Sequence, residues 1–273
     1  MNIVTSPLRF SGSVPANYDK YQGPLFFEPY AIDIAGRIDS SSVKVALEIA
    51  SGTGRVTRQL RKVLPATSKL IATDLSPDML AVAKENLSSE NIEWQIADAQ
   101  QLPFAGNSID LVVCCFGYMF VPDKVKAFSE ALRVLRPGGT FLFATWDKLE
   151  LNGASLVQRS IIKEYLGESL KELYNLPFSM NDPEVIKDQL QQAGFSKIKI
   201  EVVEKQSVSE SAKETAHGLV IGGTLYNEII NRDPKWIDEI IPRVERELTQ
   251  KYGASPMSAP MSALICEAWK YRE

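Results

Sequence analysis

Three acidic residues, Glu48, Asp74 and Asp98, each stand at or just beyond the end of a short apolar run in the first hundred residues. Small residues follow Glu48 at alternate positions, namely Ala50, Gly52 and Gly54. Small residues let a backbone approach a ligand closely, and the free N–H groups of a following helix face what is bound there. Carboxylates at the ends of neighbouring strands accept hydrogen bonds from a ribose or an adenine amino group. The pattern therefore predicts a site for a nucleoside-containing ligand.

The loop after Glu48 narrows the choice of ligand. A dinucleotide fingerprint needs a small residue three positions after Gly54, and this chain has Thr57 there. A carboxylate at the strand end would repel a pyrophosphate and favours a ligand with a cationic part. S-adenosylmethionine carries a sulfonium, an ammonium, a ribose and an adenine but no phosphate, and it fits these residues. Because a glycine loop alone also occurs in unrelated sheets, the assignment depends on the segments that follow.

These segments alternate as in a doubly wound sheet. Apolar runs predict strands at about 43–49, 69–73, 91–96, 108–115, 140–146, 196–204 and 261–270. Helical patterns occupy about 54–64, 76–87, 122–135, 153–166 and 182–193. Asp182 and Pro183 are a cap and a first-turn proline for the last of these helices. The sequence Leu-Arg-Pro-Gly-Gly at 135–139 predicts a helix end.

With these parts in this order, the chain resembles the class I S-adenosylmethionine-dependent methyltransferases of the type 11 group. It is similar to the small-molecule methyltransferases of ubiquinone and menaquinone biosynthesis. Residues 48–54 match the first motif of the family, with Ala50 where glycine is usual. The resemblance is close over about residues 15–147 and continues beyond them by layout only. It implies an α/β fold with a doubly wound seven-stranded sheet, order 3-2-1-4-5-7-6, whose last strand is antiparallel.

The resemblance also implies which residues contact the cofactor. Asp74 would hold the ribose, Asp98 and Ala99 the adenine, and Met79 would pack on the adenine face. Cys115 would offer backbone atoms near the methionine part. The full set expected to contact S-adenosylmethionine, or its product S-adenosylhomocysteine, is Tyr21, Glu48, Ala50, Ser51, Gly52, Gly54, Asp74, Leu75, Met79, Asp98, Ala99, Gln100 and Cys115.

The candidates for acceptor binding and catalysis come from other segments. His217 is the only histidine, and histidine is the side chain that ordinarily titrates near neutral pH, so it is the candidate general base. A helix-face histidine without a role is the alternative. The residues expected to contact the acceptor are Tyr18, Phe116, Tyr118, Trp146 and Asp147. Packing of the N-terminal segment is the alternative for Tyr18, burial in the core for Phe116, and helix capping for Asp147.

Composition excludes several classes of protein. The 273 residues carry a net charge of −4, with 45% apolar and 23% charged residues, as in soluble globular proteins. This charge, without any basic run, disfavours nucleic acid and anionic membrane as partners. Three cysteines form no disulfide framework, and no residues show metal-ligand spacing, which predicts a cytoplasmic protein without a metal. The oligomeric state, monomer or homodimer, stays open.

We expect one domain over residues 1–273, loosely ordered in its first fourteen residues. An aromatic segment at 14–38 and a helical cap inserted at 205–256 would cover the site as a lid. The predicted activity is methyl transfer from S-adenosylmethionine to an oxygen, carbon or nitrogen atom of a small molecule by in-line displacement. The alternatives are a non-catalytic interaction module that binds S-adenosylmethionine and, disfavoured by Thr57, Glu48 and Asp98, an NAD(P)-dependent oxidoreductase.

Overall fold

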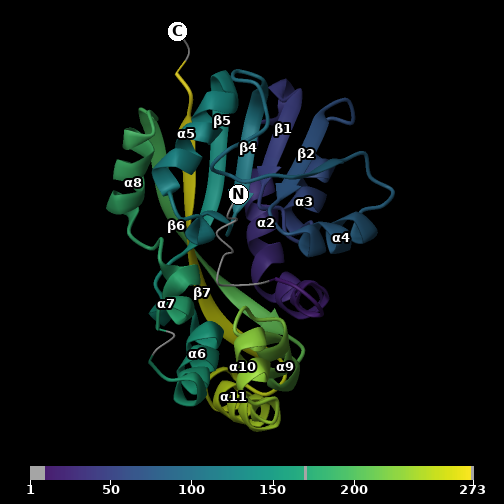
Figure 1. The fold of residues 1–273 in the computed structure, drawn as a ribbon, viewed down its shortest axis with the longest axis vertical. Coiled ribbons are helices and arrows are strands. Elements are labelled where there is room, and N and C mark those ends of the chain that lie inside the picture. Colours follow the sequence, from purple (N-terminus) through teal and green to yellow (C-terminus); the bar gives the residue numbers. More distant parts are fainter. Residues whose placement is uncertain (1–9, 169–170, 272–273) are drawn as a thin grey trace.

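A seven-stranded sheet forms the centre of the protein, which we describe from a computed structural model over residues 10–168 and 171–271 (Figure 1). Its order is β3-β2-β1-β4-β5-β7-β6. The strands are β1 (Val45–Ile49), β2 (Lys69–Asp74), β3 (Glu93–Ile96), β4 (Ile109–Cys115), β5 (Leu135–Trp146), β6 (Lys197–Ser209) and β7 (Met257–Trp269). Because β7 runs antiparallel to both β5 and β6 and the other pairs are parallel, the expected topology is confirmed.

Helices flank this sheet. Those between strands β1 and β6 are α3 (Arg55–Val63), α4 (Pro77–Asn86), α5 (Lys124–Val134), α6 (Gly153–Leu166), α7 (Lys171–Asn175) and α8 (Pro183–Gln192). Short 3-10 turns are η2 (Ser40–Ser42), η3 (Tyr118–Phe120), η4 (Leu149–Leu151) and η6 (Leu176–Phe178). Asp182 caps α8 as expected, since its carboxylate accepts from the N–H groups of Glu184 and Val185.

The N-terminal segment before β1 is helical. It comprises α1 (Val14–Asn17), the π-helix η1 (Tyr18–Phe27) and α2 (Glu28–Gly36). A π-helix of this length is rare and is typical of functional sites. α2 packs against α3, which brings the segment to residues 50–54, the loop between β1 and α3 where the sequence predicts the cofactor (the cofactor loop). Residues 1–9 lie outside the described residues. The expectation that the first fourteen residues are loosely ordered therefore stays a prediction.

Strands β6 and β7 are longer than the sequence predicts. They pair over their whole length, from Lys197 opposite Trp269 to Ser209 opposite Met257. The polar residues 205–209 carry no apolar run, but pairing with β7 satisfies their backbone groups and keeps them extended. Residues 205–209 therefore belong to β6, and the helices within the expected cap at 205–256 are α9 (Ala212–Ile221), α10 (Tyr226–Arg232) and α11 (Trp236–Tyr252). Their role as a cap stays a prediction. Figure 1 shows these helices and α6 at the end of the sheet where β6 and β7 project.

The expectation of a helix end at residues 135–139 is wrong in part. Helix α5 already ends at Val134, and Leu135 begins β5 opposite Ile109. The pairing of β4 with β5 shifts between Ile109 and Leu111, so residues 136–139 form an irregular start of the strand. Gly138 has a φ of +81°, and its N–H donates to the carbonyl of Lys270 at 2.9 Å. A glycine makes this turn of the strand possible without Cβ strain.

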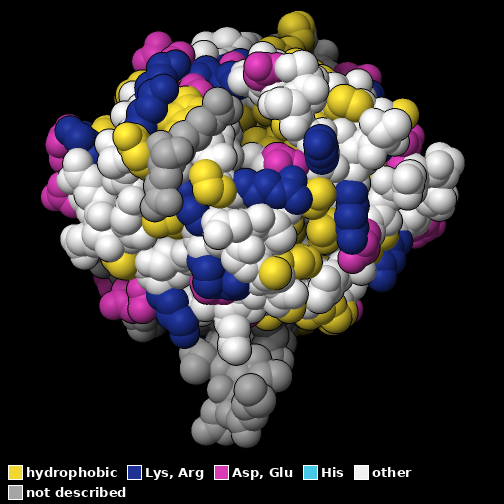
Figure 2. All heavy atoms as spheres, turned by 90° about the horizontal axis from the view of Figure 1, so that it is seen from above, with side chains coloured by type: hydrophobic (Ala, Val, Ile, Leu, Met, Phe, Trp, Pro, Cys, Tyr) yellow, Lys and Arg dark blue, Asp and Glu magenta, His cyan; other side chains and the backbone are white. Residues whose placement is uncertain are grey.

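The surface drawn in Figure 2 carries lysine and arginine interspersed with aspartate and glutamate. None of the helices within residues 10–168 and 171–271 is both long enough and apolar enough to span a membrane.

Candidate cofactor and acceptor site

The loop between β1 and α3 turns through left-handed backbone conformations. Ala50, Gly52 and Gly54 have φ values of +54°, +55° and +86°. A Cβ placed on Gly52 would meet no atom within 4 Å, so the inner side of the loop is open. At Ala50 a methyl group is accommodated in a conformation that glycine adopts more readily. The loop thus has the open, backbone-lined form that a cofactor requires.

Asp74, at the end of β2, holds this loop in place. One carboxylate oxygen accepts from the N–H of Gly52 and the other from the N–H of Ser76, each at 2.8 Å. Burial raises the pKa of Asp74, while these N–H groups counteract the rise. A carboxylate has about four acceptor positions, so each oxygen retains capacity for a ligand hydroxyl.

Unpaired polar atoms gather at the same loop. Within the part of the chain that the structure describes, five buried side-chain polar atoms have no hydrogen-bond partner of regular geometry. Three of them belong to this region: Oε2 of Glu48, Oγ of Ser51 and Oγ1 of Thr57. Burial raises the pKa of Glu48 to about 8, and the charge of Asp74 contributes. Thr57 lies next to Glu48 and counteracts the rise of its pKa through its hydroxyl and N–H, so these two groups face each other. Oγ of Ser51 is then the buried polar atom of the loop that is left for a polar ligand.

Apolar side chains flank the ends of β2 and β3. Leu75, which follows the buried strand β2, is 55% exposed, and Ile96, at the end of the half-exposed strand β3, is 57% exposed. Ile96 pairs with Asp74 in the sheet and was not expected from the sequence to take part. Asp98 lies just beyond in a turn, where its carboxylate accepts from the N–H of Gln100 at 2.8 Å. Ala99 and Met79 are buried beside this edge. Exposed apolar groups beside a carboxylate suit a planar base such as adenine.

Helix η1 is clamped onto the loop by Asp19. Its carboxylate oxygen accepts from Nε of Arg55 at 2.9 Å and from the hydroxyl of Thr53 at 2.8 Å. Nη2 of Arg55 also donates to the backbone carbonyl of Asp19 at 2.7 Å. A Cβ on Gly23 would lie 2.6 Å from Arg55, so this glycine permits the close approach. Asp19 and Arg55 belong to no sequence motif, and Thr53 lies within the first motif without having been expected to contact another segment.

Tyr18 lies between the clamp and the end of the sheet. Burial raises the pKa of its hydroxyl, and the neighbouring charges of Asp74 and Asp19 raise it further. Desolvation raises the pKa of the thiol of the partly buried Cys115, which lies near enough to Tyr18 to influence it. Tyr18 therefore sits beside the residues expected to hold the cofactor.

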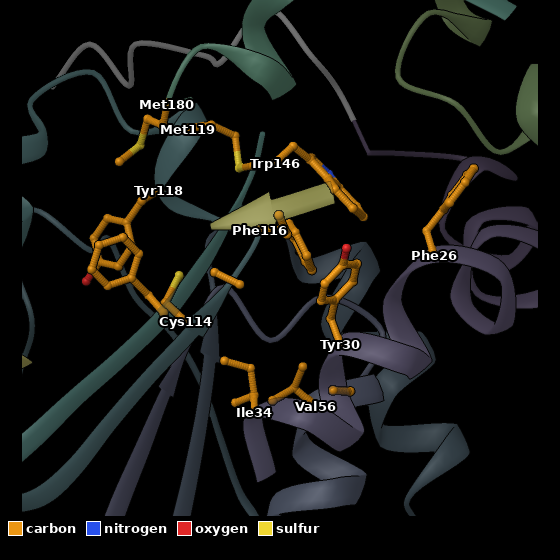
Figure 3. Packing of buried hydrophobic residues seen from close by; sticks show 14 of the residues in the cluster. Phe26, Tyr30, Ile34, Val56, Cys114, Phe116, Tyr118, Met119, Trp146 and Met180 are labelled. Carbon is orange, nitrogen blue, oxygen red and sulfur yellow. The ribbon is translucent and has the colours of Figure 1, made fainter. Parts of the chain in front are cut away.

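An aromatic cavity adjoins this region. Its aromatic lining comprises Phe10, Tyr18, Phe26, Phe27, Phe116, Phe120, Trp146 and Phe178, and its polar lining includes Gln22, Ser155, Gln158, Arg159 and Thr224. The rings of Phe116 and Trp146 are stacked with their centres 4.0 Å apart, and Tyr30 meets both edge-on (Figure 3). Phe116 has a φ of +56°, which is rare for an aromatic residue and concentrates at functional sites.

Two residues expected at the acceptor lie elsewhere. Tyr118 is fully buried in the core against Phe128 and Phe143, and Figure 3 shows it pointing away from Phe116 and Trp146. The turn η3 directs its ring inward, so its hydroxyl is not offered to the cavity. Asp147 accepts from the hydroxyl of Ser262 at 2.9 Å and from the N–H of Lys148 at 2.7 Å. It ties β5 to β7 and does not line the cavity.

Tyr21 and His217 form a pair of their own. Their ring centres are 5.4 Å apart and edge-on, between η1 and α9. Tyr21 lines an open groove with Lys20, Pro24 and residues of β6 and α9, and neither ring lines the aromatic cavity. Tyr21 therefore lies away from the loop it was expected to cover, because the π-helix turns Tyr18 and Asp19 toward the loop. The structure does not place His217 beside the acceptor space.

No three histidine, cysteine, aspartate or glutamate side chains in residues 10–168 and 171–271 are grouped as a metal site. The expectation of a reaction without a metal stays a prediction.

Comparison with known proteins gives a consistent set of relatives. A family model described as a methyltransferase domain matches residues 47–143. The ubiquinone/menaquinone biosynthesis C-methyltransferase UbiE of Hahella chejuensis is 31% identical over 207 residues, which are 67% of this chain and 80% of that protein. The UbiE protein of Idiomarina loihiensis is 30% identical over 68% of this chain and 81% of its own length.

Solved structures share the fold at lower identity. A putative methyltransferase from Bacillus halodurans has a TM-score of 0.56 at 20% identity, covering 90% of this chain and 99% of its own. A Haemonchus contortus phosphoethanolamine N-methyltransferase in complex with S-adenosylhomocysteine has a TM-score of 0.60 at 20% identity, over 94% of this chain and 57% of its own. The [4+2]-cyclase SpnF also matches, with a TM-score of 0.57 at 18% identity over 90% of this chain and 81% of its own. Because a cyclase shares the fold, the fold alone does not identify the reaction.

Proposed function

Because the chain belongs to the class I S-adenosylmethionine-dependent methyltransferases of the type 11 group, we propose that its methyl acceptor is a small molecule bound in the aromatic cavity. The observation that carries this proposal is the continuity between the cavity and the cofactor loop. Phe10 and Tyr18 belong to the lining of the cavity. The hydroxyl of Ser76 donates to the carbonyl of Phe10 at 3.1 Å, and the N–H of Ser76 donates to Asp74 at 2.8 Å. The acceptor atom is oxygen, carbon or nitrogen, and the C-methyltransferase relatives favour carbon.

The residues around the loop fit S-adenosylmethionine. Asp74 would accept from the ribose, Asp98 with Ala99 would hold the adenine, and Leu75 and Ile96 would contact its ring. Glu48, which faces Thr57, would hold the region near the methionine ammonium through the loop. When bound, the cofactor supplies an electrophilic methyl group on a sulfonium. The protein would then contribute mainly alignment and exclusion of water, which are worth about 7–11 kcal/mol of barrier.

We further propose that residues 14–38 and the cap helices move to admit the acceptor. The cavity measures about 80 Å³, well below the range of about 300–1,000 Å³ that is common for ligand pockets. The aromatic rings of the N-terminal segment, Phe26 and Phe27, close it on one side. A lid that opens and closes also keeps water from the methyl group during transfer.

Calorimetric titration of the purified protein with S-adenosylmethionine, S-adenosylhomocysteine and NADH tests the cofactor. Micromolar binding of the two sulfur ligands without NADH binding is expected. Transfer from methyl-labelled S-adenosylmethionine to small aromatic and apolar acceptors, with formation of S-adenosylhomocysteine, tests the reaction. Binding without transfer to any small molecule would favour the interaction module, and binding of NADH alone would favour the oxidoreductase.

A further inference from the structure

Arg159, in helix α6, is a buried cation on the wall of the aromatic cavity. Its side chain belongs to the polar lining, yet the residue is only 9% exposed. Nη1 donates to the backbone carbonyl of Tyr174. Nε has no hydrogen-bond partner, and among the described residues no carboxylate forms an ion pair with the guanidinium. Arg159 is thus a cation without a counter-ion.

The surroundings do not compensate for this charge. The guanidinium lies over the ring of Phe178, 5.1 Å from its centre, which is a favourable but weak contact. Burial lowers the pKa of Arg159 to about 10, so the group still carries its charge at neutral pH. A buried charge is normally paired, because burying one alone is costly. An arginine that keeps such a position without a partner points to an anion that arrives with a ligand.

The free edge of the guanidinium has a defined geometry. Because Nη1 donates to the Tyr174 carbonyl and Nε has no partner among the described residues, the edge formed by Nε and Nη2 is the one that can receive a ligand. These two parallel N–H groups match the two oxygens of a carboxylate. A neutral carbonyl or hydroxyl would satisfy only one of them.

The anion would lie at the far end of the cavity from the cofactor loop. The ring centre of Phe178, which lies under Arg159, is 6.4 Å from the ring centre of Trp146. The rings of Trp146 and Phe116 are stacked with their centres 4.0 Å apart. Phe116 directly follows Cys115, at the end of β4. Neither Glu48 nor Gly52 lines the cavity that Arg159 lines, so we assign Arg159 to the acceptor and not to the carboxylate of the cofactor.

We propose that the methyl acceptor carries a carboxylate, or an oxyanion of the same geometry, which Arg159 binds while the apolar body of the acceptor lies along Phe178 and Trp146. This inference rests on the proposed function, since it assigns one end of the same acceptor site. It defines the acceptor class as a compact, largely apolar acid.

Paired probes test the charge requirement without knowledge of the natural acceptor. The panel comprises benzoate, 4-hydroxybenzoate, salicylate, cinnamate, indole-3-acetate and hexanoate, each with its primary amide. Binding is measured by ligand-observed NMR and calorimetry on the full chain saturated with S-adenosylhomocysteine. We expect at least one acid to bind while its amide does not. Arg159→Gln should weaken that acid about 10- to 100-fold, as loss of hydrogen bonds to a charged group does.

Matched variants keep the test interpretable. Arg246→Gln removes an exposed cap arginine and should leave acid binding unchanged. Arg159→Lys keeps the charge but loses the paired donors, so this variant should bind the acid with an affinity between those of the native protein and Arg159→Gln. If Arg159→Gln fails to fold, Arg159→Lys takes its place in the test. Affinity for S-adenosylhomocysteine should stay within about threefold of the native value in every variant.

Each other outcome has a distinct meaning. Equal binding of acids and amides, or no binding of any acid, would overturn the proposal. An Arg159→Gln variant that loses S-adenosylhomocysteine but keeps the preference for acids would also overturn it, and would assign Arg159 to the cofactor carboxylate. Failure of the native protein to bind S-adenosylhomocysteine would refute the proposed function instead. The preference for acids over amides would then be measured without the cofactor, so the role of Arg159 would still be tested.

Discussion

Asp19 and Arg55 join the N-terminal segment to the cofactor loop through two hydrogen bonds. Nε of Arg55 donates to the carboxylate of Asp19 at 2.9 Å, and Nη2 donates to its backbone carbonyl at 2.7 Å. Both side chains are less than one-fifth exposed. The pair therefore couples the position of η1 to the loop that begins α3. If residues 14–38 act as a lid, this pair is the latch that holds it closed.

Asp19→Asn is expected to loosen the lid. The amide keeps the shape of the side chain but loses the charge that Arg55 requires, which costs about 2 kcal/mol for a partly buried charged hydrogen bond. Hydrogen exchange of residues 14–36 should become faster, and S-adenosylhomocysteine should dissociate faster. Lys62→Ala, an exposed residue of the same helix α3, is the control. Unchanged exchange in Asp19→Asn would show that the pair is not a latch.

Asp74→Asn is expected to weaken S-adenosylhomocysteine binding about 10- to 100-fold. Both carboxylate oxygens accept from backbone N–H groups, and the asparagine NH₂ would face one of these donors. The loop would lose its support and the ribose one acceptor. Calorimetry compares this variant with Asp78→Asn, which alters an exposed carboxylate four residues away. Equal affinities in the two variants would remove Asp74 from the site.

The sheet and the cofactor loop were predictable because their signals are local. Apolar runs mark buried strands, and the small residues from Ala50 to Gly54 mark a tight turn, which the carboxylates after the neighbouring strands identify as a ligand loop. The positive φ values at Ala50 and Gly52 agree with that interpretation. The family resemblance then supplied the strand order, which no local pattern contains.

The acceptor side was less predictable because it depends on side-chain direction and on distant contacts. Tyr118 was chosen for its hydroxyl beside Gly117, yet the turn η3 directs it into the core. Asp19 meets Arg55 across 36 positions of the chain. Arg159 is an ordinary helix residue in the sequence, and only its burial without an ion-pair partner among the described residues distinguishes it.

Glu48 should make the ligand-free protein less stable as pH rises. In the folded state its pKa is about 8 because it is buried, whereas the unfolded carboxyl ionises near its ordinary value of 4.5. Between these two values the unfolded state releases the proton first, so increasing pH favours unfolding, with a limiting slope of about 1.4 kcal/mol per pH unit. This contribution is fully present below pH 4.5 and is lost by about pH 8.

Urea unfolding at several pH values between 5 and 8 measures this slope. Glu48→Gln cannot ionise, so the free energy of unfolding of this variant should vary less with pH. Asp74, whose pKa is also raised, contributes a dependence of the same sign in both proteins. Identical pH profiles for the two proteins would mean that Glu48 is already ionised when folded.

Phe116 should show backbone strain that its ring contacts offset. Its φ of +56° is a conformation that glycine adopts freely and other residues adopt at a cost of about 1–2 kcal/mol. Phe116→Gly and Phe116→Ala both remove the stack on Trp146, but only glycine removes the strain. We therefore expect Phe116→Gly to be the more stable variant by about 1 kcal/mol in urea unfolding, against the usual preference of about 0.5–1 kcal/mol for alanine.

The same pair of substitutions at Phe128, a buried residue inside helix α5, is the control, and there alanine should be more stable. If Phe116→Ala were as stable as Phe116→Gly, the left-handed conformation would not be fixed in the folded protein. The ring of Phe116 lies in the acceptor cavity and not in the cofactor loop. The affinity of Phe116→Gly for S-adenosylhomocysteine should therefore change by less than about threefold, whereas its methyl transfer should be lost. That combination would locate the stored strain on the acceptor side, where the ring stack between Phe116 and Trp146 has to hold the reacting molecule in line.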